Sequence, residues 1–79
     1  MTGTVKNLIL RDEGQKTSGY GFITGDDDQR IRFFHANDLI EGLTLEQLQV
    51  GDRMEFLASE DVSVTKRGNG LRCETVRRA

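Results

Sequence analysis

Short runs in which apolar and polar residues alternate, separated by turn-forming residues, make up most of this 79-residue chain. Nine glycines and no proline punctuate these runs, and no segment has the pattern of a long helix. Alternation with a period of two residues is typical of short strands that bury one face. The expected strands lie at residues 4–10, 19–24, 30–35, 53–58 and 71–76.

The segments between the strands predict how the strands connect. Residues 25–28 have the composition of a tight turn, so the second and third strands should form a hairpin. Residues 11–17 are polar and are expected to form a loop, and Gly-Asn-Gly at 68–70 predicts another turn. In the long connection before the fourth strand, good capping residues predict a short helical turn at 37–42. Residues 44–47 have capping-box spacing, which predicts a second short turn.

Five short strands with one long connection indicate an all-β fold, a small barrel. A chain of this length has room for a single domain, residues 1–79. Because 35% of the residues are apolar, the core must be small. The expected core includes Val5, Leu45, Leu48, Val50, Leu71, Cys73 and either Thr75 or Val76.

Four ring side chains on two neighbouring strands carry the main functional signal. Side chains alternate between the two faces of a strand, so Tyr20 and Phe22 share a face, with Gly21 between them. Read in the same way, Phe33 and His35 share a face on the next strand. We call these four side chains the ring face. Rings that lie side by side and open to water commonly bind single-stranded nucleic acid. The alternative, in which Tyr20 and Phe22 fill the core, would leave the interior with little to pack.

The charge distribution does not indicate a uniformly basic surface. The net charge is −2, from 11 basic and 13 acidic residues, whereas strong non-specific phosphate binding usually needs a basic surface. The acidic run at 26–28 lacks the spaced ligands of a calcium loop and is expected to be a solvated turn. Basic residues gather beside the proposed rings, where Arg32, Arg67 and Arg72 are candidate phosphate contacts. For Arg67 and Arg72 a solvated charged face is the alternative.

No residue pattern indicates catalysis, a metal site or a membrane segment. A single cysteine, Cys73, has no partner for a disulfide or a zinc site. His35 has no second ligand at metal-binding spacing and no nucleophile beside it, so we expect no enzyme activity, cofactor or metal. No stretch approaches the roughly 20 apolar residues of a membrane span, and the first residues lack the apolar run of a secretory signal. We therefore expect a cytoplasmic protein without a small-molecule substrate.

The order of four short motifs resembles that of the bacterial cold-shock domain family. The matching segments are Gly-Thr-Val-Lys at 3–6, Gly-Tyr-Gly-Phe-Ile-Thr at 19–24, Phe-Phe-His at 33–35 and Gly-Asp-Arg-Met-Glu-Phe at 51–56. This resemblance covers nearly the whole chain. It implies a five-stranded antiparallel OB-type barrel that binds single-stranded RNA or DNA without a cofactor and without catalysis.

The same resemblance implies roles for individual residues. Tyr20 and Phe22 match the stacking aromatics of the family's second strand, and Phe33 and His35 match those of its third. Lys6 matches a basic contact on the first strand. Members of the family act as RNA chaperones or as regulators of transcription and translation. Stacking of this kind competes with base pairing, which would let a small barrel melt RNA hairpins without ATP.

The chain also departs from the family pattern. Asn7, Leu8 and Ala36 stand where the family has aromatic residues. Because one base–aromatic stack is worth about 1–3 kcal/mol, these losses predict weaker binding than in typical members. The alternative function is an OB-fold module for protein interaction or homodimer formation. In that case Leu8, Ile31 and Leu43 would form an apolar patch beside the rings.

The third strand admits two registers. If His35 lies on the ring face, Ile31 and Phe33 lie there too. Arg32 and Phe34 then point inward, and an inward arginine is costly unless it reaches the rim or a carboxylate. A bulge would instead turn Ile31 and Phe33 inward and place Arg32 and Phe34 on the outer face. We favour the first register, which is the one that the family implies.

Overall fold

The computed structural model describes residues 1–13, 16–60 and 71–79, and it contains all five expected strands. Two short 3₁₀ turns, η1 and η2, lie in the connection between the third and fourth strands. η2 lies where the capping box predicted it, whereas the turn predicted at 37–42 was misplaced, because η1 begins after His35 as its N-cap and ends at Asp38. The turn predicted at residues 68–70 lies outside the described residues. The elements are β1 (Thr2–Glu13), β2 (Lys16–Gly25), β3 (Ile31–His35), η1 (Ala36–Asp38), η2 (Leu45–Gln47), β4 (Arg53–Glu60) and β5 (Leu71–Arg78).

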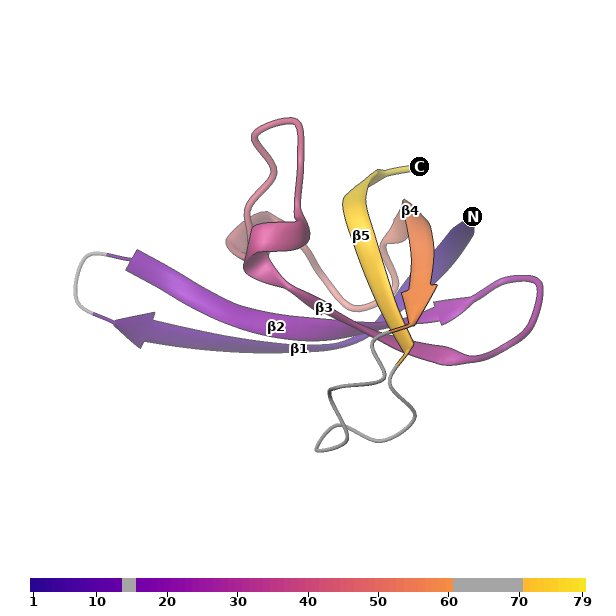
Figure 1. Ribbon diagram of the computed structural model, residues 1–79. Coiled ribbons are helices and arrows are strands. Elements are labelled where there is room, and N and C mark those ends of the chain that lie inside the picture. Colours follow the sequence, from indigo (N-terminus) through magenta and orange to yellow (C-terminus); the bar gives the residue numbers. More distant parts are fainter. Residues whose placement is uncertain (14–15, 61–70) are drawn as a thin grey trace.

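The strands close into a barrel in the order β1-β2-β3-β5-β4, as Figure 1 shows. β2 forms antiparallel hairpins with β1 and with β3, and β4 closes against the start of β1 through pairs such as Gly3 with Met54. β3 meets β5 in parallel, with Phe33 beside Arg72. The all-β barrel expected from the sequence is confirmed, with this one parallel contact in an otherwise antiparallel set of described strands.

The core lies inside the barrel and beneath the connection that contains η1 and η2. Val5 and Cys73 are buried as expected, and Leu45 and Leu48 of the connection pack into the same cluster. Val50 does not, because it precedes the tight turn at Gly51 and remains 64% exposed, so its assignment to the core was wrong. The buried cluster consists of Val5, Ile23, Phe34, Leu45, Leu48, Met54, Phe56, Cys73 and Val76.

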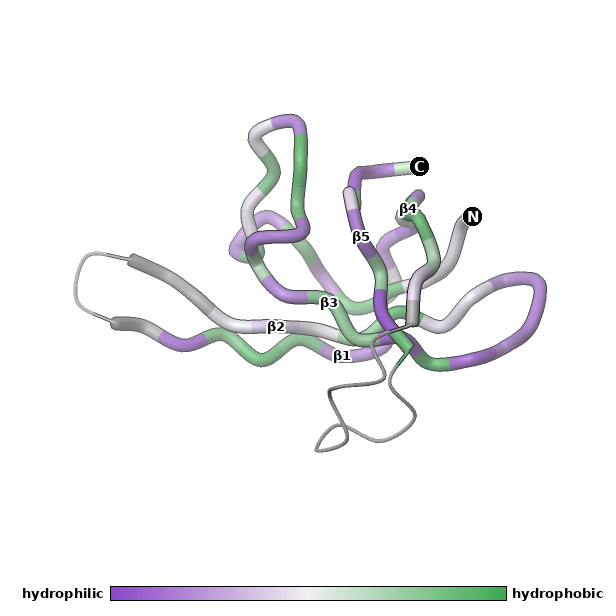
Figure 2. The backbone as a smooth tube through the Cα atoms, viewed as in Figure 1, coloured by the Kyte–Doolittle hydropathy of each residue, from purple (hydrophilic) through white to green (hydrophobic). Residues whose placement is uncertain are grey.

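β1 and β2 continue beyond the barrel as a two-stranded arm. The loop predicted at 11–17 was wrong for residues 11–13 and 16–17, because strand pairing continues to the pair Glu13 and Lys16, and residues 14–15 lie outside the described part of the chain. Leu8 packs against the core, whereas Leu10, two residues further along, is 46% exposed. Figure 1 shows the arm projecting from the barrel, and Figure 2 shows that the apolar residues of β1 continue into it. A ribbon with water on both sides loses the alternation that identifies a strand, which explains the wrong prediction.

β3 adopts the first of the two registers considered. Phe34 is fully buried and Arg32 is 6% exposed, so both point inward. Arg32 reaches a carboxylate, as an inward arginine should. Its Nη2 lies 2.6 Å and its Nη1 3.1 Å from the oxygens of Asp28, and its guanidinium lies 5.9 Å from the centre of the Phe56 ring.

Backbone strain at Thr75 decides which residue of β5 enters the core. Leu71 and Cys73 point inward with ordinary alternation, and Thr75 would be the next inward residue. Thr75 instead has a φ of +48°, and the chain turns so that Val76 is buried in its place. A β-branched residue at positive φ is an outlier that costs on the order of 1–3 kcal/mol.

We predict that Thr75→Gly raises the free energy of unfolding by about 1 kcal/mol. Glycine adopts positive φ without strain, and this gain exceeds the roughly 0.4–1 kcal/mol by which glycine increases the entropy of the unfolded chain. Urea denaturation followed by circular dichroism measures the change. Thr24→Gly, in the extended backbone of β2, is the matched control and should destabilise the protein. Equal losses in both variants would show that Thr75 is not strained.

The acidic turn between β2 and β3 is tied to the barrel by ion pairs. Figure 2 shows this turn as a hydrophilic segment. Asp26 accepts hydrogen bonds from Arg53 Nη1 at 2.7 Å and from Thr2 Oγ1 at 2.7 Å. The Arg53 guanidinium is the main cause that lowers the pKa of Asp26 from 3.8 to about 2, and Arg32 does the same for Asp28.

Asp26→Asn should reduce stability by an amount that depends on pH. A carboxyl whose pKa is lower in the folded state contributes stability above its unfolded pKa and loses it as the pH falls through the folded one. The difference between the native protein and Asp26→Asn should therefore be largest above about pH 4 and shrink toward pH 2. Denaturant titrations across this range measure it, and Arg53→Gln should show the same trend. A difference that is constant with pH would contradict the ion pair.

Candidate nucleic-acid interface

The four rings of the ring face lie on the outer side of β2 and β3. The register of this hairpin places Tyr20 directly opposite His35 and Phe22 directly opposite Phe33. All four side chains are half-buried, and none belongs to the core cluster. The prediction that Tyr20 and Phe22 lie outside the core, on the same surface as Phe33 and His35, is therefore confirmed.

Three of the rings touch one another at an angle. The centroids of Phe22 and Phe33 are 5.9 Å apart, those of Tyr20 and Phe22 are 5.9 Å apart, and those of Tyr20 and Phe33 are 5.4 Å apart. The angle between the ring planes is 87° for Tyr20 and Phe22 and 66° for Phe22 and Phe33. Edge-to-face pairs of this kind are worth about 0.5–1.5 kcal/mol beyond burial, so the rings support one another's orientation.

Gly21 allows the strand that carries Tyr20 and Phe22 to pack directly against the core. A Cβ atom at this position would lie 2.7 Å from the Phe34 ring and 2.9 Å from the backbone oxygen of Asn7. Any larger residue would therefore push Phe34 away from β2. Glycine between Tyr20 and Phe22 lets a core phenylalanine pack against the inner side of the strand that carries the two rings.

His35 is held by the first turn that follows β3. Its Nδ1 accepts a hydrogen bond from the backbone N–H of Asn37 at 3.1 Å, which leaves Nε2 as the nitrogen that donates in the neutral ring. The backbone N–H of His35 donates to Asp38 Oδ2 at 2.7 Å. These two bonds fix the imidazole at the end of the ring face, opposite Tyr20.

Asp38 also positions Arg72. The Nη2 of Arg72 lies 3.1 Å from Asp38 Oδ2, and its guanidinium lies 5.8 Å from the centre of the Phe33 ring. Arg72 thus lies at the edge of the ring face, where it was expected, with its charge partly balanced by Asp38. The sequence analysis placed Asp38 in a short helical turn and missed its contact with Arg72, since no local pattern links Asp38 to a residue in β5.

Lys6 occupies a bulge beside the ring face. Val5 lies opposite Ile23 and Asn7 lies opposite Phe22, so Lys6 has no opposite residue in β2. The bulge interrupts the alternation and leaves both Lys6 and Asn7 exposed. These two residues, with Phe22 and Ile31, line a hollow of about 250 Å³.

Of the remaining two candidates, Arg32 does not lie on this surface. Arg32 was expected to contact phosphates beside the rings, but its side chain lies inside the barrel and is paired with Asp28. The alternation of β3 requires this, because a strand that presents Phe33 outward must turn Arg32 inward. Arg67 lies outside the described residues. Of the predicted set, the structure brings together Lys6, Tyr20, Phe22, Phe33, His35 and Arg72.

The described residues contain no group of three or more His, Cys, Asp or Glu side chains that could hold a metal ion. They also form no helix that could serve as a membrane span. Cys73 is fully buried, and burial raises the pKa of its thiol to about 12. The expectation that Cys73 packs as a small core residue is confirmed.

A closed five-stranded barrel with rings on the outer side of β2 and β3 is the architecture of OB-type nucleic-acid-binding domains. The sequence matches the profile of the family described as "'Cold-shock' DNA-binding domain" over residues 1–78. The chain therefore belongs to the cold-shock domain family, as its motifs indicated. This is a family of domains that bind single-stranded nucleic acid, and it is not a class of enzymes. A search of curated proteins finds no match to this chain.

Proposed function

We propose that this domain binds single-stranded RNA or DNA by stacking bases on the ring face and acts as an RNA chaperone or as a regulator of transcription or translation. The observation that carries the proposal is the cross-strand register, which places Tyr20 opposite His35 and Phe22 opposite Phe33. Half-buried rings on adjacent strands offer successive platforms for unstacked bases. Bases held in this way are withdrawn from pairing, which opens hairpins without ATP.

Binding is weaker than in typical members of the family. Asn7, Leu8 and Ala36 provide no platform where the family pattern has aromatic residues. Removing two or three stacks makes the free energy of binding less favourable by roughly 3–6 kcal/mol after allowance for non-additivity. That corresponds to about two to four orders of magnitude in Kd. The footprint then narrows to the bases that contact β2 and β3.

The phosphate contacts of this footprint are few. Lys6 is exposed in its bulge next to Phe22, and Arg72 lies next to Phe33. The hollow between Lys6, Asn7 and Ile31 adjoins the Phe22 ring, so a base that stacks on Phe22 has space there. A face with rings at its centre and single cations at its edges favours stacking over charge as the main source of affinity.

A protein-interaction face receives less support. The patch considered for that role consisted of Leu8, Ile31 and Leu43. Leu8 and Leu43 pack against the core, which leaves Ile31, 38% exposed, as the most exposed of the three. A single exposed isoleucine is ordinary for a protein surface.

Replacing Tyr20 or Phe22 with alanine should weaken binding of oligothymidine or oligouridine. One lost stack of about 1–3 kcal/mol corresponds to a roughly 5- to 150-fold rise in Kd, and the double variant should abolish measurable binding. Fluorescence anisotropy of a labelled oligonucleotide measures this, with circular dichroism to confirm the fold. Leu57→Ala, a change of similar kind on β4 where Leu57 is 61% exposed, is the control. Unchanged titrations in the double variant would reject the proposed function.

Lys6→Ala should change how binding depends on salt. Each phosphate contact to a single strand contributes about −0.7 to the slope of log K against log salt concentration. The loss of one contact should reduce the steepness by about this amount and leave stacking in place. The same anisotropy titration at several salt concentrations measures the slope. Arg78→Ala removes an equal charge from the far end of β5, and an equal effect there would mean that Lys6 acts through net charge alone.

A further inference from the structure

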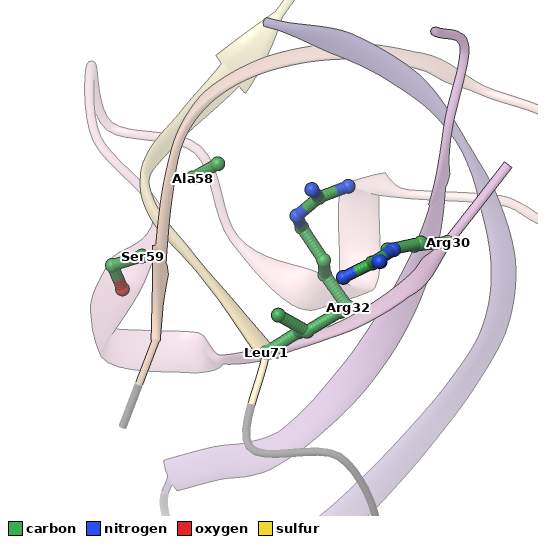
Figure 3. Close-up of a pocket in the computed structure, with 5 residues that line it drawn as sticks. All are labelled: Arg30, Arg32, Ala58, Ser59 and Leu71. Atoms are coloured by element: carbon green, nitrogen blue, oxygen red, sulfur yellow. The ribbon is translucent and has the colours of Figure 1, made fainter. Parts of the chain in front are cut away.

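A second concave site lies at the end of the barrel where β3 and β5 begin and β4 ends. Its volume is about 290 Å³, and Figure 3 shows the residues that line it. Arg30 and Arg32 project to the same side of the chain in this view, while the intervening Ile31 is exposed beside Phe22 on the outer surface. This hollow is therefore distinct from the ring face. Its lining consists of Arg30, Arg32, Ala58, Ser59 and Leu71.

Arg32 brings an unsatisfied donor to this site. Its two terminal nitrogens bond to Asp28, but its Nε is buried and has no hydrogen-bond partner among the described residues. Arg32 is 6% exposed and is one of the residues that line the hollow. A buried donor without a partner costs about 1–3 kcal/mol, and such a group in a native protein calls for an explanation. An aliphatic side chain would fill the same space without that cost.

Arg30 adds a second guanidinium at the mouth of the hollow. Its side chain points toward that of Arg32 in Figure 3 and, within the described ranges, forms no ion pair. Asp28 accepts a hydrogen bond from the backbone N–H of Arg30 at 3.0 Å, and its carboxylate forms an ion pair with the Arg32 guanidinium. One carboxylate thus faces two guanidinium groups, and this cluster of three side chains retains one positive charge.

We propose that this hollow binds a phosphate group. Guanidinium groups recognise phosphate through charge-assisted hydrogen bonds, and two of them converge here beside the apolar walls of Ala58 and Leu71. A cation would be repelled, and an apolar ligand would leave the Arg32 N–H without a partner. The phosphate is either free, as inorganic phosphate or a mononucleotide, or the terminal phosphate of a nucleic-acid strand.

The first test follows the Nε–H resonance of Arg32 by ¹⁵N–¹H NMR of the full chain. Adding inorganic phosphate at constant ionic strength should shift this resonance to saturation, whereas chloride should not. Arg30→Gln should weaken the apparent affinity for phosphate about fivefold or more, because one charged donor is lost. Arg11→Gln is the matched control, since Arg11 is an exposed arginine on the arm, away from the hollow, and should bind phosphate as the native protein does.

The second test separates the two sources of phosphate. Oligothymidines that carry a 5′-phosphate, a 3′-phosphate or neither are compared in the native protein and in Arg30→Gln. A preference for one phosphorylated end that disappears in Arg30→Gln supports a strand terminus as the ligand. Equal binding of all three, together with the shift produced by inorganic phosphate, supports a free phosphate.

An Arg32 Nε–H resonance that does not respond to phosphate would overturn the proposal and leave bound water as the partner of this N–H. Equal effects of Arg30→Gln and Arg11→Gln on phosphate binding would also overturn it. The phosphate titration does not involve the ring face, so its result is independent of whether Tyr20 and Phe22 bind bases. Failure of one proposal is thus distinguishable from failure of the other.

Discussion

The Phe34 ring packs against the inner side of β2 directly beneath Gly21, and the rest of the structure depends on this contact. It fixes which side of the β2–β3 hairpin faces the core. Once Phe34 is inside, the alternation of β3 places Phe33 and His35 outside, and the pairing with β2 brings them opposite Phe22 and Tyr20. The same packing thus holds the barrel together and assembles the ring face.

The same constraint accounts for the arginine inside the barrel. A strand that presents Phe33 outward must turn residues 32 and 34 inward, and in this chain residue 32 is an arginine. The acidic turn before β3 supplies the compensating charge, since Asp28 lies four residues earlier and reaches the guanidinium across the turn. Burying a charge is tolerated when it is paired and hydrogen-bonded. The pairing here leaves the Nε of Arg32 without a partner among the described residues, which makes the end of the barrel chemically distinct from its middle.

Much of this arrangement could be read from the sequence, because strand alternation is a local property. The five strands, the ring face and the inward direction of Arg32 follow from a period of two residues once His35 sets the register. Local patterns fail where tertiary structure decides. The arm has no core beneath it, so its strands lose alternation, and Val50 has an apolar side chain but stands next to a turn that points it into water. Thr75 breaks alternation through positive φ, and the link from Asp38 to Arg72 spans 34 residues, beyond the reach of any motif.

The rate at which Cys73 reacts with an alkylating reagent reports how often the barrel opens. Its thiol is fully buried opposite Ala58 in the β4–β5 ladder, and the thiolate is the form that reacts with alkylating reagents. With a pKa near 12 and no route for a reagent, the closed barrel is inert at neutral pH. Reaction requires that β4 and β5 separate at least transiently. Since the sequence holds one cysteine, the speed of its modification reports the frequency of that separation without any added label.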